Sequence, residues 1–206
     1  KRRVVRSITA RIRQSFNVAE VINYFAVNMC LSNWDGFFNN YFTYHDLNGT
    51  GKWEMYPWDE DKTWGDYDGA SPSYDWYQMP LTFGMNGERP QRSLLNMFGG
   101  GPWGGTSWWR PPGHFSGPLL ANPEFRKQFL ARLRELCSTI FTEEKFSPVI
   151  RAMEQRLTQE IRISAEARGE DAQQSLRSFQ RDIQSFLQQV ANRRKFILAE
   201  LESAKR

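Results

Sequence analysis

The sequence predicts an α+β protein that is predominantly α-helical. Its last third, residues 119–206, repeats apolar residues at intervals of three and four, which is typical of amphipathic helices. Residues 17–32 show the same spacing near the start of the chain. Between these regions, residues 40–44 and 52–58 are short runs rich in aromatic residues that predict the two strands of a β-hairpin. We therefore expect one largely helical domain that carries a small hairpin.

The composition indicates a packed globular protein. The chain has 206 residues, of which 40% are hydrophobic and 15% aromatic, enough for one buried core and contrary to the composition of disordered chains. The two cysteines fit neither a disulfide framework nor a metal pattern, and Cys30 is expected to be simply buried. His45 and His114 stand alone and do not suggest a zinc site. No apolar run approaches the roughly 20 residues that span a bilayer.

Positive charge is concentrated at the start of the chain. Six basic residues and no acidic residue lie within residues 1–13, whereas the formal net charge of the whole chain is only +4. Aromatic residues do not interleave with this run, so we expect no nucleic-acid partner. We interpret the run as a solvated connecting segment at the edge of a longer protein, because the chain also begins with Lys rather than Met.

Helix boundaries can be placed at several polar residues and at one glycine. Asn17, with Glu20 three residues later, predicts the start of the first helix, and Asn122 before Pro123 predicts the start of another. Thr142 is expected to begin the next helix, and a break near Gly169 precedes a long final one. The apolar stripe of this last helix is expected to be core, and its polar face is expected to be solvated.

Residues 69–118 are rich in glycine, proline and tryptophan and are expected to form an irregular loop. The glycines match no phosphate-binding motif, because no strand precedes them and no Lys-Ser or Lys-Thr follows. Trp103, Trp108 and Trp109 could stack on a sugar, a base or a peptide, or could pack on their own domain.

Most of the chemically suggestive carboxylates lie between aromatic residues in residues 33–68. Such oxygens can hold a hard cation in a partly desolvated cleft. The segment that joins the two strands has some residues of an EF-hand loop, beginning at Asp46, but Pro57 stands where the bidentate Glu is required. We therefore interpret that segment as a turn.

The spacing of Asp35 and Asn40 has a chemical meaning. An Asp at the start of a loop can orient a hydroxyl, and an Asn five residues later, where a strand begins, can offer an amide oxygen to a metal. Protein kinases use this spacing and follow it with a hairpin and a further metal-binding Asp. Here the hairpin leads to Asp59.

Four motifs in this region resemble those of the CotH family of atypical, secreted-type protein kinases. They are Asn33-Trp34-Asp35, Asn40-Tyr41-Phe42-Thr43-Tyr44, Gly51-Lys52-Trp53 and Pro57-Trp58-Asp59-Glu60-Asp61-Lys62-Thr63-Trp64-Gly65. The Asn122-Pro123-Glu124-Phe125-Arg126 segment and the helical tail with Arg193-Arg194 are similar to the carboxyl-terminal region of that family. The resemblance spans roughly residues 17–205.

The resemblance implies roles for four residues. Asp35 would be the catalytic Asp, Asn40 and Asp59 would be metal ligands, and Asp61 would bind the same metal or a second one. Mg²⁺ or Mn²⁺ would bridge the phosphates of ATP, and the hydroxyl of a Ser or Thr in a protein substrate would attack the γ-phosphorus.

The resemblance also implies an architecture. The chain would be one domain portion, residues 1–206, resembling the carboxyl-terminal lobe of a protein kinase, with a catalytic and metal-binding core at 17–68, the loop at 69–118 and a helical subdomain at 119–206. The nucleotide-binding amino-terminal lobe is missing, so we expect it upstream in a longer parent. The family implies an extracellular, cell-surface or spore-surface location.

Three alternatives remain open at this level. The chain could be a coat or adhesion protein that keeps the fold for binding, with the Trp-rich loop as its contact surface. Two carboxylates flanked by Trp also suit a glycoside hydrolase. Finally, the carboxylates could cap turns or hold a structural ion, with Trp34 and Trp58 in the core.

Overall fold

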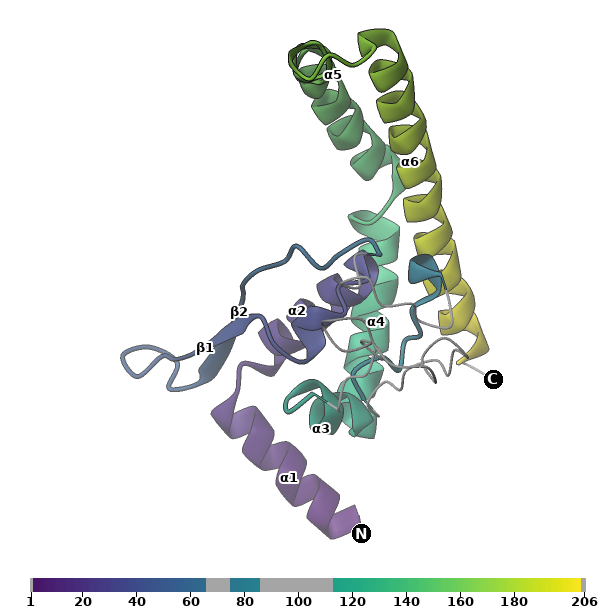
Figure 1. Ribbon diagram of the computed structural model, residues 1–206. Helices are drawn as coiled ribbons and strands as arrows, with labels where there is room; N and C mark the ends of the chain where they lie inside the picture. The colour runs from purple at the N-terminus through teal and green to yellow at the C-terminus, as the bar shows by residue number, and fades with distance from the viewer. Residues whose placement is uncertain (1, 66–74, 86–112, 205–206) are drawn as a thin grey trace, which may run out of the picture.

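The computed structural model describes residues 2–65, 75–85 and 113–204, and these form a helical body with one β-hairpin (Figure 1). The elements in chain order are α1 (Arg2–Ser15), α2 (Val18–Leu31), the 3-10 helix η1 (Asp35–Phe37), β1 (Tyr41–His45), β2 (Trp53–Pro57), the 3-10 helix η2 (Trp76–Gln78), α3 (Ser116–Ala121), α4 (Pro123–Thr139), α5 (Glu143–Ala167) and α6 (Ala172–Ser203). The predicted mostly helical α+β class is confirmed.

The core lies where α2 packs against α4, and α6 and β2 close it from the sides (Figure 1). Its fully buried side chains are mainly aromatic and aliphatic: Phe25, Met29, Trp34, Phe37, Phe83, Phe125, Phe129, Leu133 and Ile197. Cys30 is buried here as predicted, and Cys137 is buried beside it in the same core. Because α2 is apolar on most of its surface, it can lie inside the body and deliver its carboxyl end to the interior.

The hairpin forms at the predicted place, within one residue of the expected strand ends. The antiparallel register pairs Phe42 with Tyr56 and Thr43 with Met55. The connecting segment is a turn, since the Asp46 carboxylate accepts a hydrogen bond from the Thr50 amide at 2.6 Å. Met55 is buried, whereas Phe42 on the opposite face is 57% exposed. One face of the hairpin therefore packs on the body, and the other carries exposed aromatic rings.

The helical third follows the sequence prediction closely. Asn122 caps α4 by accepting a hydrogen bond from the Glu124 amide, with Pro123 at the first helical position. Asp171 caps α6 in the same way, after a turn at Gly169 in which φ is +71°. Helices α5 and α6 pack against each other and extend away from the body (Figure 1). No helix in residues 2–65, 75–85 or 113–204 has the length and hydrophobicity needed to cross a membrane.

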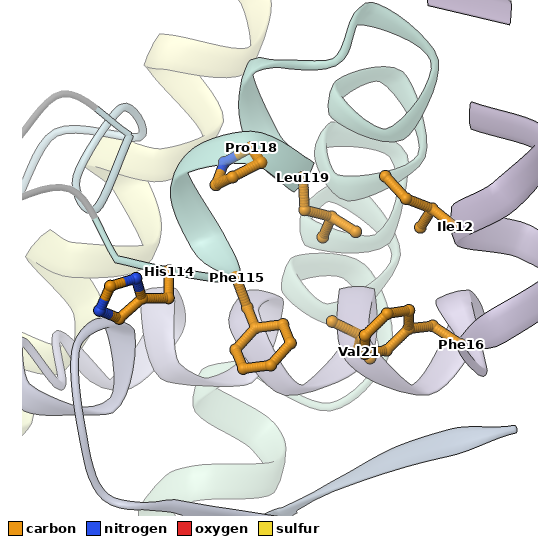
Figure 2. Close-up of a pocket in the computed structure, with 7 residues that line it drawn as sticks. All are labelled: Ile12, Phe16, Val21, His114, Phe115, Pro118 and Leu119. Carbon is orange, nitrogen blue, oxygen red and sulfur yellow. The ribbon is translucent and has the colours of Figure 1, made fainter. Parts of the chain in front are cut away.

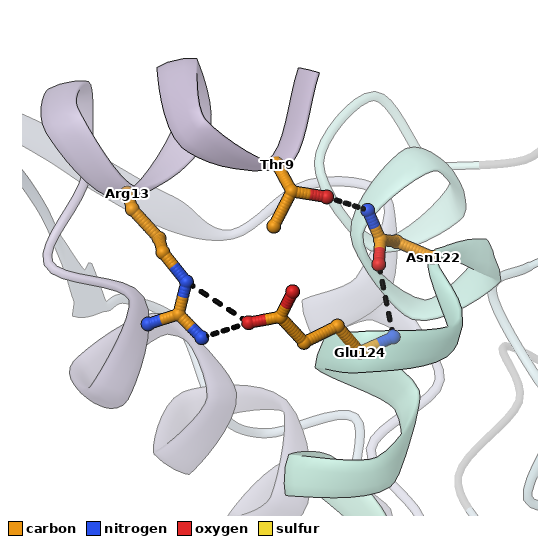
Figure 3. A network of polar contacts seen from close by, with 4 residues as sticks. All are labelled: Thr9, Arg13, Asn122 and Glu124. Carbon is orange, nitrogen blue, oxygen red and sulfur yellow. Dashed lines mark hydrogen bonds and ion pairs between the residues drawn. The ribbon is translucent and has the colours of Figure 1, made fainter. Parts of the chain in front are cut away.

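The basic amino-terminal run is more than the solvated connecting segment expected from the sequence. The Arg11 and Arg13 side chains are exposed as expected, but the run forms a helix. These residues form α1, which is held against the start of α4 (Figure 3). The Asn122 side chain donates to the Thr9 hydroxyl at 2.8 Å, and Arg13 forms an ion pair with Glu124. Apolar residues recur at helical spacing between the arginines, and this spacing is typical of an amphipathic helix.

The end of α1 also contributes to an apolar cavity of about 230 Å³. Figure 2 shows the side chains around it, which come from α1 and the residue after it, from α2, and from α3 and the two residues before it: Ile12, Phe16, Val21, His114, Phe115, Pro118 and Leu119. Phe16 and Phe115 meet edge to face with ring centroids 5.6 Å apart. Ile12 and Phe16 therefore join α1 to the core.

The predicted irregular loop at residues 69–118 is only partly described. Its described portion, residues 75–85 and 113–118, includes η2, a turn over residues 81–85 and the first residues of α3, so this portion is less irregular than expected. Residues 66–68 of the predicted core and Trp103, Trp108 and Trp109 lie outside the described residues.

The apolar faces of α5 and α6 differ in how much of their surface is buried. On α6, Leu176, Val190, Ile197 and Leu201 are buried, as predicted for a core stripe. On α5, Val149, Met153 and Leu157 are about half exposed, at 55%, 55% and 46%. Helix α6 covers only one side of α5, so part of the α5 apolar surface remains uncovered in the described residues.

The expectation that the polar face of α6 is entirely solvated was wrong at Arg193, which is 0% exposed. Its guanidinium donates to the Met29 carbonyl at 2.6 and 3.1 Å, to the Tyr77 carbonyl at 3.1 Å and to the Met79 carbonyl at 2.6 Å. Met29 lies in the last turn of α2, whose carbonyls lack helical partners and favour a cation. Arg193 therefore fastens α6 to the end of α2 and to the η2 segment.

We predict that Arg193→Met lowers the free energy of unfolding by about 3 kcal/mol, because two buried carbonyls and one partly buried carbonyl lose charge-assisted hydrogen bonds. Urea unfolding followed by circular dichroism measures the change. Arg181→Met on the exposed surface of the same helix is the matched control and should stay within about 0.5 kcal/mol of wild type. Equal losses in the two variants would contradict the role of Arg193.

Candidate functional site

Asp35 lies at the start of η1, directly beyond the carboxyl end of α2. Its side chain is largely buried, with the residue 8% exposed. The Asn39 side-chain amide donates to Oδ1 at 2.8 Å, and the Asn40 amide donates to Oδ2 at 2.7 Å. The structure thus brings Asp35 and Asn40 into direct contact, and the two amides hold the carboxylate in one orientation.

Asn33 is the centre of the hydrogen-bond network behind Asp35. Its side chain is fully buried, and its Oδ1 accepts from the backbone amides of Asp35 at 3.1 Å and Gly36 at 3.2 Å. Its Nδ2 donates to Asn28 Oδ1 at 2.9 Å and to Glu60 Oε2 at 2.6 Å. One side chain therefore forms the turn that presents Asp35 and also ties this turn to two other segments.

Tyr24 supports the same turn from α2. Its hydroxyl lies 3.0 Å from the Gly36 carbonyl oxygen and 3.3 Å from that of Asn40, a geometry suited to donation. Burial, reinforced by the nearby Glu60 charge, raises the pKa of Tyr24, so the hydroxyl keeps its proton. A Cβ atom on Gly36 would lie 3.0 Å from this hydroxyl and 3.1 Å from Asn28 Oδ1. Glycine therefore allows α2 to approach the turn this closely.

The hairpin places Asp59, just after β2, next to Asn40, just before β1. The Trp58 amide donates to the Asn40 carbonyl at 3.2 Å, and the Asn40 side-chain amide lies 3.5 Å from the Asp59 carbonyl oxygen. Asp59 is exposed. The order proposed from the sequence, Asp35, Asn40, hairpin and Asp59, is therefore also a spatial cluster in which Asn40 is the middle member.

Asp61 lies farther along the exposed chain. Its carboxylate is 3.5 Å from the Lys62 ammonium group, and its side chain is 59% exposed. Within residues 2–65, 75–85 and 113–204, no three His, Cys, Asp or Glu side chains are placed to hold a metal together. A metal here would need oxygen ligands from elsewhere, such as the phosphates and waters that usually complete a Mg²⁺ shell.

Glu60 differs from its two acidic neighbours because it is half-buried. Its Oε2 accepts a hydrogen bond from Asn33, but its Oε1 is buried and has no hydrogen-bond partner within the described part of the chain. Desolvation raises the pKa of Glu60, and the hydrogen bond from Asn33 offsets part of that shift. Glu60 also lines a cavity of about 340 Å³ together with Glu20, Tyr24 and Asn28.

Left-handed backbone conformations gather around this site. Ser32, Asn40, Asp59 and Trp64 have φ between 51° and 56°, and they are the four non-glycine residues with positive φ in the described residues. Such conformations cost about 1–2 kcal/mol per residue, most for a bulky residue such as Trp. The Trp64 amide donates to the Leu31 carbonyl at 3.1 Å, and its ring packs against Phe141, Phe146 and Phe186. These contacts hold the strained backbone in place.

Sequence interpretation missed the supporting residues Tyr24, Asn28, Asn33 and Glu60. One signal was available, since Asn33 is part of the Asn33-Trp34-Asp35 motif and Asn is typical of turns. Asn28 and Tyr24 lie on a helix whose sequence predicts a buried core helix. Nothing in their spacing indicates that their side chains form hydrogen bonds with the following loop. Glu60 adjoins the two acids assigned to the metal, yet only the structure distinguishes it from them.

The acidic loop, the hairpin and the helical tail thus follow one another in the order that the sequence motifs indicate. The sequence matches the family described as CotH kinase protein over residues 4–197, and the chain belongs to this family. It is also similar to the inner spore coat protein H of Bacillus subtilis (strain 168), with 26% identity over 148 residues. That match covers 72% of this chain and 33% of the relative, so the chain spans about a third of the length of that protein.

We predict that Asn33→Asp lowers the free energy of unfolding by about 2–4 kcal/mol, because a carboxylate oxygen would then face Asn28 Oδ1 and the Glu60 carboxylate. Denaturant unfolding at neutral pH measures this loss. Asn48→Asp in the exposed hairpin turn makes the same chemical change and should be nearly neutral. A similar, small effect of both variants would contradict the network.

Proposed function

We propose that this chain is the carboxyl-terminal-lobe portion of an ATP-dependent protein Ser/Thr phosphotransferase of the CotH type. Membership of the CotH kinase family supports the reaction class. The observation that carries the proposal is the contact of the Asp35 carboxylate with the Asn40 amide, beside the returning Asp59 segment. In protein kinases a catalytic Asp and a metal-binding Asn act together to position the acceptor hydroxyl next to the metal-bound nucleotide, and the contact between Asp35 and Asn40 supports the same roles here.

In this proposal the protein residues supply position and charge. Asp35, held by the two amides, would accept a hydrogen bond and then the proton from the acceptor hydroxyl. Asn40 and Asp59 would offer oxygens to Mg²⁺ or Mn²⁺, and Asp61 would add a further carboxylate from the exposed side. Bound ATP with its metal would supply the phosphoryl group. The fixed orientation of Asp35 supports this role, because preorganised charge needs little rearrangement during the reaction.

The site is expected to be completed by residues outside this chain. Kinases contact the nucleotide phosphates with a Lys that a Glu holds in place, and we assign that lobe to another part of the parent protein. The name of the Bacillus relative supports a spore-coat or surface location. A protein carrying the acceptor Ser or Thr is the expected substrate.

In the full-length protein, we predict that Asp35→Ala and Asp59→Ala each reduce transfer of labelled phosphate from ATP by at least about 100-fold, through loss of the base or of a metal ligand. The assay uses Mg²⁺ or Mn²⁺, with circular dichroism to confirm folding. Asp182→Ala on the exposed surface of α6 is the control and should keep full activity. Undiminished transfer by both site variants would remove the assignment.

A second candidate is a binding protein that retains the kinase-like fold without catalysis. The exposed face of the hairpin favours it, since Phe42, Tyr44, Tyr56 and Trp58 are 57%, 51%, 44% and 58% exposed on one surface. The Phe42 and Trp58 ring centroids are 5.1 Å apart. Aromatic side chains exposed in this way are common at recognition surfaces.

The two candidates differ in nucleotide binding. For a phosphotransferase, we predict that calorimetry on the full-length protein detects ATP binding that requires a divalent cation and that Asp59→Ala weakens at least tenfold. For the binding protein, calorimetry would detect no ATP binding. In that case Phe42→Ala with Trp58→Ala should abolish attachment to the coat or cell surface, while Leu47→Ala at the exposed hairpin tip should not.

A further inference from the structure

Two segments of the candidate site are joined through the buried side-chain amide of Asn33. In the turn that presents Asp35, Asn33 Oδ1 accepts hydrogen bonds from two backbone amides. The NH₂ group of the same side chain donates a hydrogen bond to Glu60, which lies in the segment that follows Asp59. Asn40 provides a second link, because it contacts both the Asp35 carboxylate and the Asp59 carbonyl. The relative position of the two segments therefore depends on a few defined hydrogen bonds.

The orientation of the Asn33 amide is unambiguous. Rotation by half a turn would place its oxygen against Asn28 Oδ1 and Glu60 Oε2, and its NH₂ group against two backbone amides. All four hydrogen bonds would be lost. A carboxylate at the NH₂ end also polarises the amide, so its oxygen becomes a better acceptor for the Asp35 and Gly36 amides.

Glu60 is poorly stabilised in its own surroundings. One carboxylate oxygen is buried and has no hydrogen-bond partner among the residues that the structure describes, and the residue is partly withdrawn from water. A buried acceptor without a hydrogen bond costs folding free energy. Packing therefore does not explain a glutamate here, whereas its bond to Asn33 gives it a role in holding the turn.

We propose that Glu60 is a positioning residue for phosphotransfer. It acts through Asn33 to fix the turn that carries Asp35 relative to the segment that carries Asp59, and this inference rests on the phosphotransfer function proposed above. Glu60 does not touch the reacting atoms. Its removal should therefore lower kcat while the KM for nucleotide stays the same, and it should not destabilise the fold.

The test compares Glu60→Ala and Glu60→Gln in the full-length protein with the same two substitutions at Glu20. Glu20 is a suitable control because it lines the same cavity but accepts from the Met55 amide of the hairpin instead of Asn33. We expect Glu60→Ala to lower kcat about 10–100-fold, the range for partners that orient active-site groups, with KM for ATP within about twofold of wild type. Glu60→Gln keeps an acceptor oxygen and should recover most of the rate. The Glu20 variants should keep the wild-type kcat.

Hydrogen exchange followed by mass spectrometry provides a readout that does not depend on activity. In Glu60→Ala, peptides that contain the amides of Asp35 and Gly36 should exchange about five- to tenfold faster, as expected for one weakened hydrogen bond. Peptides from the middle of α2 should not change, and the melting temperature should stay the same or rise.

Three results would overturn the proposal. They are a kcat within about twofold of wild type for Glu60→Ala, unchanged exchange at Asp35 and Gly36, or a loss of activity matched by a fall in melting temperature. If the wild-type protein transfers no phosphate, the proposed function fails and the proposed role in phosphotransfer fails with it. The exchange data then separately support or overturn the structural link between Glu60 and the Asp35 turn.

Discussion

The candidate site depends on one buried side-chain amide, that of Asn33. A turn inside a protein leaves backbone amides that cannot reach water, and each one needs an acceptor. Asn33 supplies that acceptor to two consecutive amides and uses its own NH₂ group to bind Asn28 and Glu60. The chain can therefore reverse direction within the interior beyond α2 and place the carboxylate of Asp35 where two further amides hold it.

A second buried polar group fixes the helix from which this turn begins. Arg193 of α6 donates to a carbonyl in the last turn of α2, and the same guanidinium holds the η2 segment. The long final helix is thus connected to the acidic loop although about 160 residues separate them in sequence. Both polar side chains are 0% exposed, and in such surroundings hydrogen bonds are strong and an unpaired group is costly.

The same region combines a rigid interior with an exposed aromatic surface. Met55 anchors the inner face of the hairpin, while the rings of Phe42 and Trp58 remain exposed on the outer face. Asn40 and Asp59 lie at the base of this hairpin, next to Asp35. A ligand or partner that contacts the outer face would therefore lie close to the residues proposed for chemistry, which makes the hairpin relevant to both candidate functions.

The sequence by itself determined the four helices α2, α4, α5 and α6, the hairpin and the family. Periodicity places α2, α4 and α6 because burial of an apolar face requires that spacing, and the predicted cap at Asn122 uses a local hydrogen bond. The spacing of Asp35, Asn40 and Asp59 likewise indicated one cluster, because a hairpin brings the ends of its two strands together.

Only the tertiary structure decided which polar residues support that cluster. Asn28, Glu60 and Arg193 look like ordinary polar residues in the sequence, since their partners lie on other elements and local pattern does not encode such contacts. The docking of α1 was also a tertiary result, as it depends on contacts with Asn122 and Glu124 that lie more than 100 residues away. Local sequence determines which segments become helices and strands, whereas the pairing of buried polar groups depends on how distant segments pack together.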